Sequence, residues 1–233
     1  MSESGLQARA LELLAQDIAA AIGYLSSQPD ADAEAVADCY LDLQKHLYYE
    51  AKDLANLTLM SAAGIQFALA QAHRLPESAY LLRSKAKALT YNLASYTWPG
   101  WDEPKLPINA AHLAMGLSAA KANLRLAREL DKGDLPLSRA HWVVGAHRLA
   151  LADWPAALKS FTAAVEYAQK ADATADALLS QGYIALTEIL RDVANADAQQ
   201  RLSNLKTQLA DLEYGDFFVQ QLDSALAVFK TDD

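Results

Sequence analysis

Four cations repeat at helical spacing near the middle of the chain. They are separated by four, three and four residues, and they are Lys121, Arg125, Arg128 and Lys132. At 100° per residue, this spacing puts all four on one narrow stripe of a helix. A basic stripe in a chain of net charge −9 can hold a carboxylate or a phosphate. It can equally be a solvated face whose positive charge suits the C-terminal end of a helix.

One histidine and one glutamate have the spacing of metal ligands. His46 and Glu50 are four residues apart, on one face of a predicted helix. A metal site needs at least a third protein ligand, and none is near this pair in the sequence. The paired Glu-x-x-His motifs of helical di-metal proteins are also missing. We therefore expect no bound metal.

Short catalytic and phosphate-binding motifs are missing as well. The sequence contains no G-x-S-x-G, no G-x-x-x-x-G-K-[ST] and no G-x-G-x-x-G, and its nine glycines are spread singly. Cys39 is the only cysteine, and we interpret it as a small apolar core residue. We expect a noncatalytic protein without a cofactor, and the alternative is an enzyme with dispersed active-site residues.

Composition restricts the partners and the compartment. Hydrophobic residues make up 52% and charged residues 21% of the 233 residues, which is typical of a folded chain. The net charge of −9 argues against binding to nucleic acid or to anionic membranes. No apolar stretch is long enough to span a bilayer, no secretory signal is recognisable, and a single cysteine suits a reducing compartment. We expect a cytoplasmic protein.

Helices must position these residues, because Ala and Leu dominate the chain and β-branched residues are few. Apolar residues recur at helical spacing between the prolines, which predicts an all-α fold of about nine to eleven helices. A single helix over 32–74 would be roughly 65 Å long, so we expect a break at 53–56. We expect one all-helical domain, 1–233, with helical hairpins in 1–97, a packed connector rich in Pro and Trp in 98–107, and further hairpins in 108–233.

The stretch 138–170 has the pattern of a two-helix repeat. Gly145 lies in the middle of the first predicted helix, and Asp153 lies at the turn. In the second helix small residues flank an aromatic residue: Ala157, Phe161 and Ala164. This pattern resembles the tetratricopeptide repeat, a 34-residue helix–turn–helix. Because small residues let two helices approach closely, we expect Gly145 to face the second helix, with Phe161 packed between this hairpin and the next.

The resemblance implies antiparallel helical hairpins stacked as a right-handed solenoid, with a nonrepetitive α-helical bundle as the alternative. Residues 173–212 can form a further hairpin, with Gly182 in the role of Gly145. The resemblance also implies a concave groove for a protein or peptide partner, faced by Arg139 and Trp142. Ordinary core packing is the alternative for Trp142.

The cation stripe and the repeat together predict one partner-binding groove. Its residues are Lys121, Arg125, Arg128, Arg139 and Trp142. We expect this groove to take an acidic segment of a protein that the sequence does not identify. The alternative function is a self-associating scaffold, because an apolar C-terminal segment can form either a capping helix or the contact surface of a homodimer: Phe217, Phe218, Val219, Leu222, Leu226 and Phe229.

Overall fold

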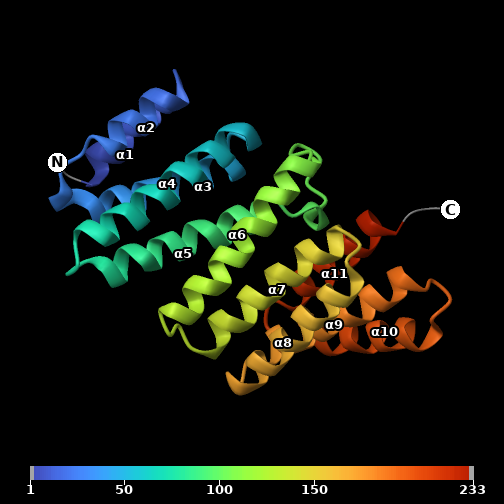
Figure 1. The fold of residues 1–233 in the computed structure, drawn as a ribbon. Helices are drawn as coiled ribbons and strands as arrows, with labels where there is room; N and C mark the ends of the chain where they lie inside the picture. Colours follow the sequence, from blue (N-terminus) through green and yellow to red (C-terminus); the bar gives the residue numbers. More distant parts are fainter. Residues whose placement is uncertain (1–2, 231–233) are drawn as a thin grey trace. The chain divides into compact units, whose positions relative to one another are not determined.

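The computed structural model describes residues 3–230, which form eleven α-helices and two short 3-10 helices without a β-strand (Figure 1). Of the described residues, 81% are helical. The predicted all-α class is therefore confirmed, and the number of α-helices lies at the upper end of the predicted range.

The chain divides into two compact units, residues 1–96 and residues 97–233. The connector predicted at 98–107 is part of the second unit. The helices of the first unit are α1 (Glu3–Leu14), α2 (Ile18–Ser26), η1 (Asp30–Asp32), α3 (Ala33–Tyr49), α4 (Leu54–Arg74) and α5 (Ala79–Tyr96). Those of the second unit are η2 (Pro99–Trp101), α6 (Ala110–Glu129), α7 (Asp134–Ala150), α8 (Trp154–Lys170), α9 (Thr174–Arg191), α10 (Ala196–Ala210) and α11 (Gly215–Phe229).

A break separates α3 from α4, close to where the sequence predicts one. Lys52 has a positive φ of 53°, which turns the chain away from the axis of α3. Asp53 then caps α4, because its side chain accepts a hydrogen bond from the backbone N of Asn56 at 3.0 Å. This cap satisfies one of the amide groups that the start of a helix leaves unpaired. The predicted break is confirmed and begins a few residues earlier than 53–56.

The first unit is held by a core that joins three helices. α3, α4 and α5 pack against one another, and α1 and α2 pack on α3 and α4. Buried Gln44 of α3 donates through its Nε2 to Ser61 Oγ of α4 at 2.7 Å and to the Leu89 carbonyl of α5 at 3.1 Å. Because unpaired polar groups are costly to bury, these bonds favour one arrangement of the three helices.

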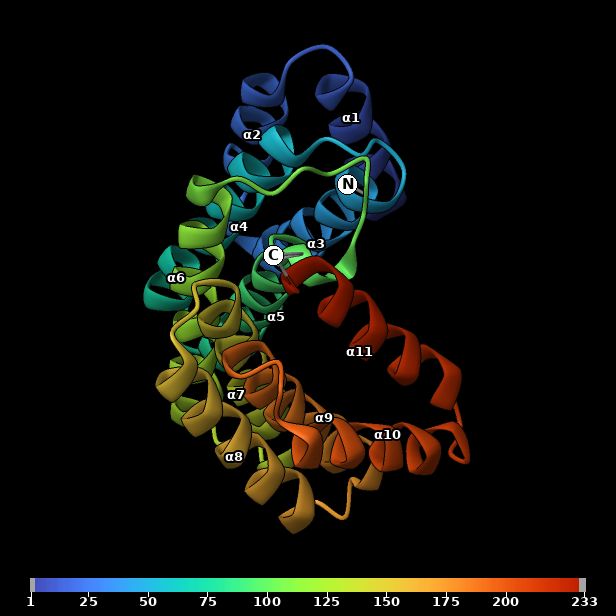
Figure 2. The same cartoon turned by 90° about the vertical axis from the view of Figure 1, so that its right-hand side faces the viewer.

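Consecutive helices of the second unit pack side by side, from α6 on α7 to α10 on α11. α7 therefore lies between α6 and α8, and α9 lies between α8 and α10. The last helix, α11, also contacts α9 and η2. In Figure 2, α11 runs from the end of α10 back toward the green segment that precedes α6. The second unit thus brings its final helix back to the segment with which it begins.

Close helix contact at Gly145 agrees with the sequence prediction. A Cβ atom at this position would lie 2.7 Å from Phe161 Cε1 of α8, so only a hydrogen fits there. Ser138 of α7 adds a hydrogen bond from its Oγ to the Ala164 carbonyl at 2.8 Å. Gly182 has a different partner from the one predicted, because its close neighbour is Leu222 of α11 and not a residue of α10. The prediction that Gly182 repeats the role of Gly145 is wrong.

The connector packs against the body of the second unit, as the sequence predicts. Trp98 is 1% exposed, and its indole Nε1 donates to the carbonyl of Ala146 in α7 at 3.0 Å. Gly100 lies so close to this indole that a Cβ would come within 2.3 Å of Trp98 Cζ2. The connector is therefore a structural element of the second unit and not a flexible tether.

Candidate functional site

Helix α6 presents a row of cations to solvent. Its start is fixed by a capping box, in which Asn109 and His112 exchange side-chain and backbone hydrogen bonds. Lys121, Arg125 and Arg128 are all exposed, while the opposite face of the helix is buried. Arg125 Nε forms a long, exposed ion pair with Glu129 Oε1 of the same helix at 3.6 Å, a kind of pair that contributes little. Lys132 leaves the predicted stripe, because α6 ends at Glu129 and Asp131 takes a positive φ of 47°. The name cation stripe is kept below for Lys121, Arg125 and Arg128.

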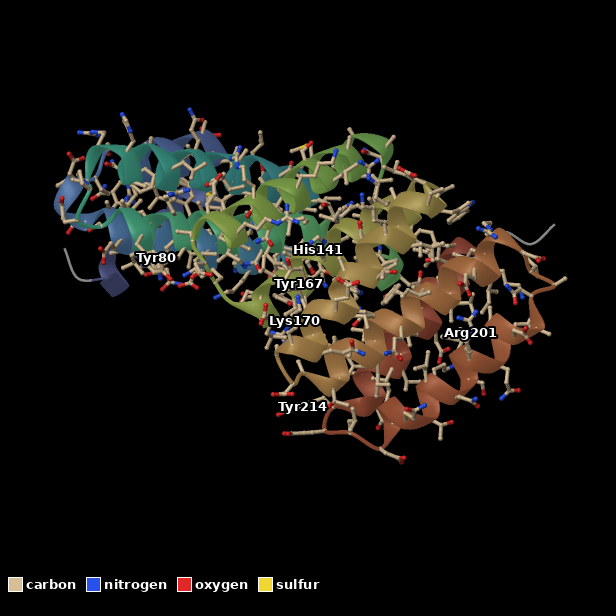
Figure 3. The ribbon with its side chains drawn as sticks, turned by 60° about the horizontal axis from the view of Figure 1, so that its bottom comes forward. Tyr80, His141, Tyr167, Lys170, Arg201 and Tyr214 are labelled. Carbon is tan, nitrogen blue, oxygen red and sulfur yellow. The ribbon has the colours of Figure 1, made fainter. Side chains whose placement is uncertain are left out.

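Side chains from three helices continue this surface away from α6. Arg128 Nη2 donates to His141 Nε2 of α7 at 3.2 Å. The imidazole ring stacks on Tyr167 of α8, with the ring centroids 5.4 Å apart and the planes inclined by 15°. The ammonium of Lys170, also on α8, lies 5.1 Å from the centroid of the Tyr167 ring (Figure 3). We call Arg128, His141, Tyr167 and Lys170 the cation–aromatic row.

Electrostatics keep the middle of this row uncharged. Burial and, to a lesser degree, the Arg128 guanidinium lower the pKa of His141 to about 4. The imidazole is therefore neutral at pH 7, and its Nε2 is the acceptor for Arg128, so the proton lies on Nδ1. Two uncharged rings thus separate the two cations of the row. The hydrogen bond to His141 and the contact with the Tyr167 ring favour positions of Arg128 and Lys170 on this surface.

Two residues of the predicted groove lie elsewhere. Arg139 precedes His141 by two residues, which places it about 200° away around α7. Its Nε forms an ion pair with Asp176 Oδ1 of α9 at 2.8 Å. Trp142 is 6% exposed and lies inside the second unit. The structure therefore brings Lys121, Arg125 and Arg128 together but separates them from Arg139 and Trp142.

Aromatic rings fill the space next to Trp142. Its ring meets Trp98 at 5.6 Å, Tyr183 at 5.5 Å and Trp101 at 6.1 Å between centroids. Phe161 stacks on Tyr183 at 5.2 Å. Burial raises the pKa of Tyr183, so its hydroxyl stays protonated. The inner side of α7, where the sequence predicts a ligand groove, is occupied by the protein's own connector.

A separate cavity of about 620 Å³ opens between α9, α10 and α11. Its apolar wall comes from Ile189, Leu202, Val219 and Leu226, and charged residues stand around it: Lys206, Asp216 and Lys230. Lys206 is already bonded to Asp223 Oδ1 of α11 at 2.5 Å. This cavity has the size of a ligand site, but its charges are of both signs and one of them is internally paired.

The residues considered for metal binding or nucleophilic chemistry do not form a site. His46 Nδ1 and Glu50 Oε2 are 3.0 Å apart on the surface. The described part of the chain holds no group of three His, Cys, Asp or Glu side chains able to bind a metal ion. Burial raises the pKa of Cys39 to about 12, so at neutral pH this residue is a thiol and not a nucleophilic thiolate.

Comparison with known proteins gives no relative. No family model, no curated protein and no solved structure matches the chain. Within residues 3–230, no helix is both long enough and apolar enough to cross a bilayer.

Sequence reasoning found Arg128 but missed the three residues that lie beside it. The register of the α7–α8 hairpin indicates which residues of α8 lie near His141. Since Gly145 faces Phe161 in an antiparallel pair, a residue one turn earlier in α7 faces a residue one to two turns later in α8. That pairing puts His141 level with about Val165, close to the position of Tyr167 on which it stacks, and Lys170 follows about one turn along the same helix.

Proposed function

We propose that this protein is a noncatalytic helical interaction module that binds an acidic segment of a partner protein on the outer surface of α6, α7 and α8. The site consists of the cation stripe and the cation–aromatic row. The predicted function class is kept, but the proposed surface differs from the predicted groove, because Arg139 and Trp142 are not part of it.

The cation–aromatic row is the observation that carries this proposal. Long basic side chains lose conformational freedom when they bind, and this loss weakens most exposed ion pairs. Arg128 is already oriented by His141, and Lys170 is oriented by Tyr167. Less freedom remains to be lost when a carboxylate binds there. Hydrogen bonds between guanidinium and carboxylate groups are also among the stronger ones in proteins.

The predicted solenoid agrees with binding of a partner segment on the surface of α6, α7 and α8. We propose that the second unit is a stack of tetratricopeptide-like hairpins, supported by the contact between Gly145 and Phe161 and by the sequential packing of α6 to α11. Stacked hairpins expose long, regular helix faces along which a partner segment can lie. We also propose that the protein works in the cytoplasm, because its one cysteine is a buried free thiol.

A labelled glutamate-rich peptide tests the proposal, with a peptide in which glutamine replaces every glutamate as the uncharged comparison. We expect the acidic peptide alone to bind, more weakly as salt rises. The double variant Arg125→Gln/Arg128→Gln should weaken binding by about tenfold or more. Arg9→Gln/Lys45→Gln removes the same charge from the first unit and serves as the matched control. Equal loss in both variants would show nonspecific charge attraction and contradict the site.

Self-association is the second candidate, and exposed aromatic side chains favour it. Tyr214 is 74% exposed and Phe217 is 57% exposed, both near the turn between α10 and α11. Neighbouring exposed aromatic residues are typical of contact surfaces. Sedimentation equilibrium of wild type and Tyr214→Ser/Phe217→Ser distinguishes the two functions. A dimer that the double variant dissociates supports the scaffold, whereas a monomer at all concentrations excludes it.

A further inference from the structure

We propose that the acidic ligand is an amphipathic α-helix that lies along α6, with carboxylates on the cation stripe and apolar side chains on a neighbouring flank of leucines. This inference rests on the proposed function and specifies the conformation and the side-chain pattern of the partner segment. Three observations on α6 carry it.

The first observation is the spacing of the cations. Lys121, Arg125 and Arg128 are separated by four and three residues on an exposed face of α6. At about 1.5 Å per residue, their Cα atoms are spaced by roughly 6 and 4.5 Å along the axis. A second helix running beside α6 repeats its side chains with the same rise. Glutamates at positions i, i+3, i+4 and i+7 therefore match the three cations in either direction of the partner helix.

The second observation is an apolar flank beside the cations. Leu113, Leu117 and Leu124 are partly exposed. By their positions around the helix, these leucines lie between the cation stripe and the buried face of α6 that packs on α7. Arg128, one turn beyond Leu124, donates a hydrogen bond to His141 of α7. A partner helix whose acidic and apolar rows are neighbours would meet both rows of α6 at once.

The third observation is the room for close approach. Ala114 and Ser118 continue the exposed face of α6 toward its N-terminus with small side chains. Helices that pack through small residues reach axis separations of about 8–10 Å, where side chains interdigitate. Bulky residues at these two positions would keep a second helix away. The exposed face of α6 therefore combines small, apolar and cationic side chains, all of which a second helix packed beside it would contact.

An extended ligand fits this surface less well. The backbone groups of α6 are used within the helix, so they offer no ladder of hydrogen bonds to a strand. An extended segment would leave its own amide groups unpaired wherever it covers the leucine flank. A helical ligand satisfies these groups internally, and only its side chains need partners. The side-chain pattern of α6 and the requirement for backbone pairing thus both favour a helical ligand.

Two labelled peptides of identical composition, rich in Glu, Leu and Ala, test the inference on the full chain. The segregated peptide has glutamates at i, i+3, i+4 and i+7 with leucines on the adjacent flank, and the scrambled peptide has the same residues without a common face. We expect the segregated peptide to bind about tenfold or more tightly than the scrambled peptide. Its ¹³Cα chemical shifts should move toward helical values on binding.

Variants of α6 identify the surface that the peptide uses. Leu117→Ala/Leu124→Ala should weaken the segregated peptide and leave the scrambled one nearly unchanged. Leu59→Ala/Leu151→Ala removes two exposed leucines elsewhere and should change neither. Circular dichroism confirms that each variant is folded.

The outcomes separate this inference from the proposed function. If both peptides bind equally and lose affinity equally in Arg125→Gln/Arg128→Gln, the acidic site stands and the helical ligand is contradicted. If neither peptide binds the wild-type chain in low salt, both proposals are contradicted. If the segregated peptide binds tightly but keeps its affinity in Leu117→Ala/Leu124→Ala, it docks elsewhere and the inference is again overturned.

Discussion

On its inner side α7 packs Trp142 against Trp98 and Tyr183, whereas on its outer side His141 joins Arg128 to Tyr167. Trp142 and His141 are adjacent in the sequence, and about 100° around the helix separates a buried aromatic cluster from a surface row. The difference comes from what covers each side. The connector and Tyr183 of α9 cover the inner side at Trp142, while His141 stays partly exposed between Arg128 of α6 and Tyr167 of α8. Residue type alone therefore does not identify a binding residue, because the same helix buries His147 completely while its other histidine, His141, lies at the surface.

The largest expected effect comes from truncating Trp98, which covers the inner side of α7. Trp98→Ala should lower the free energy of unfolding by about 3–5 kcal/mol, since it truncates a fully buried aromatic residue. It also removes the hydrogen bond to the Ala146 carbonyl. Denaturant unfolding measures this change, and Tyr214→Ala, at a 74% exposed position, should stay within about 0.5 kcal/mol of wild type. Similar midpoints for the two variants would contradict the buried position of Trp98.

The contact that sets the register between α7 and α8 gives the next effect. Gly145→Leu should destabilise by about 1–3 kcal/mol or more, because even a Cβ would lie 2.7 Å from Phe161 Cε1. Phe161→Ala alone should cost about 3–5 kcal/mol. Combined, the two changes should cost less than their sum, since the smaller residue at 161 makes room for leucine. A double-mutant cycle by thermal unfolding measures this coupling, and strict additivity would show that the two residues do not meet.

Titration of His141 tests the outer side. Its pKa is about 4 in the folded chain, below the ordinary value of about 6.5. The unfolded chain therefore binds this proton first as pH falls, so the stabilising contribution is present above about pH 6.5 and is lost on the way to pH 4. His141→Phe, which keeps the ring against Tyr167, should show a smaller loss of stability over this range. NMR titration gives the pKa directly, and a value near 6.5 would contradict the partial burial of the His141 ring beside Arg128.

The smallest expected effect concerns the turn that joins α7 to α8. Ala152 has a φ of 54°, a conformation that suits glycine better than a residue with a Cβ. Ala152→Gly should therefore raise the free energy of unfolding by a few tenths of a kcal/mol, up to about 1. Ala150→Gly, two residues earlier in the helix, should lower it by about 0.5–1 kcal/mol. Denaturant midpoints that move in the same direction for both variants would contradict the left-handed turn.

Features determined by neighbouring residues could be predicted from the sequence, and contacts between distant residues could not. The helices, the break before Asp53 and the approach of Gly145 to the second helix follow from local spacing and from one hairpin. The position of Trp142 depends on Trp98, whose hydrogen bond to Ala146 spans 48 residues. Helical spacing placed Lys121, Arg125 and Arg128 on one face, but it carries no information about which side of α7 remains open.

One NMR experiment measures both sides of α7 at once and tests the central claim. The full chain, labelled with ¹⁵N, is titrated with the segregated acidic peptide. The account predicts shifts in the amide signals of α6 around Lys121–Arg128 and in those of His141, Tyr167 and Lys170. The indole Nε1–H signals of Trp98 and Trp142 should stay unchanged. Shifts of the two indole signals without changes in α6 would show that the ligand enters the inner side of α7, and would contradict the account.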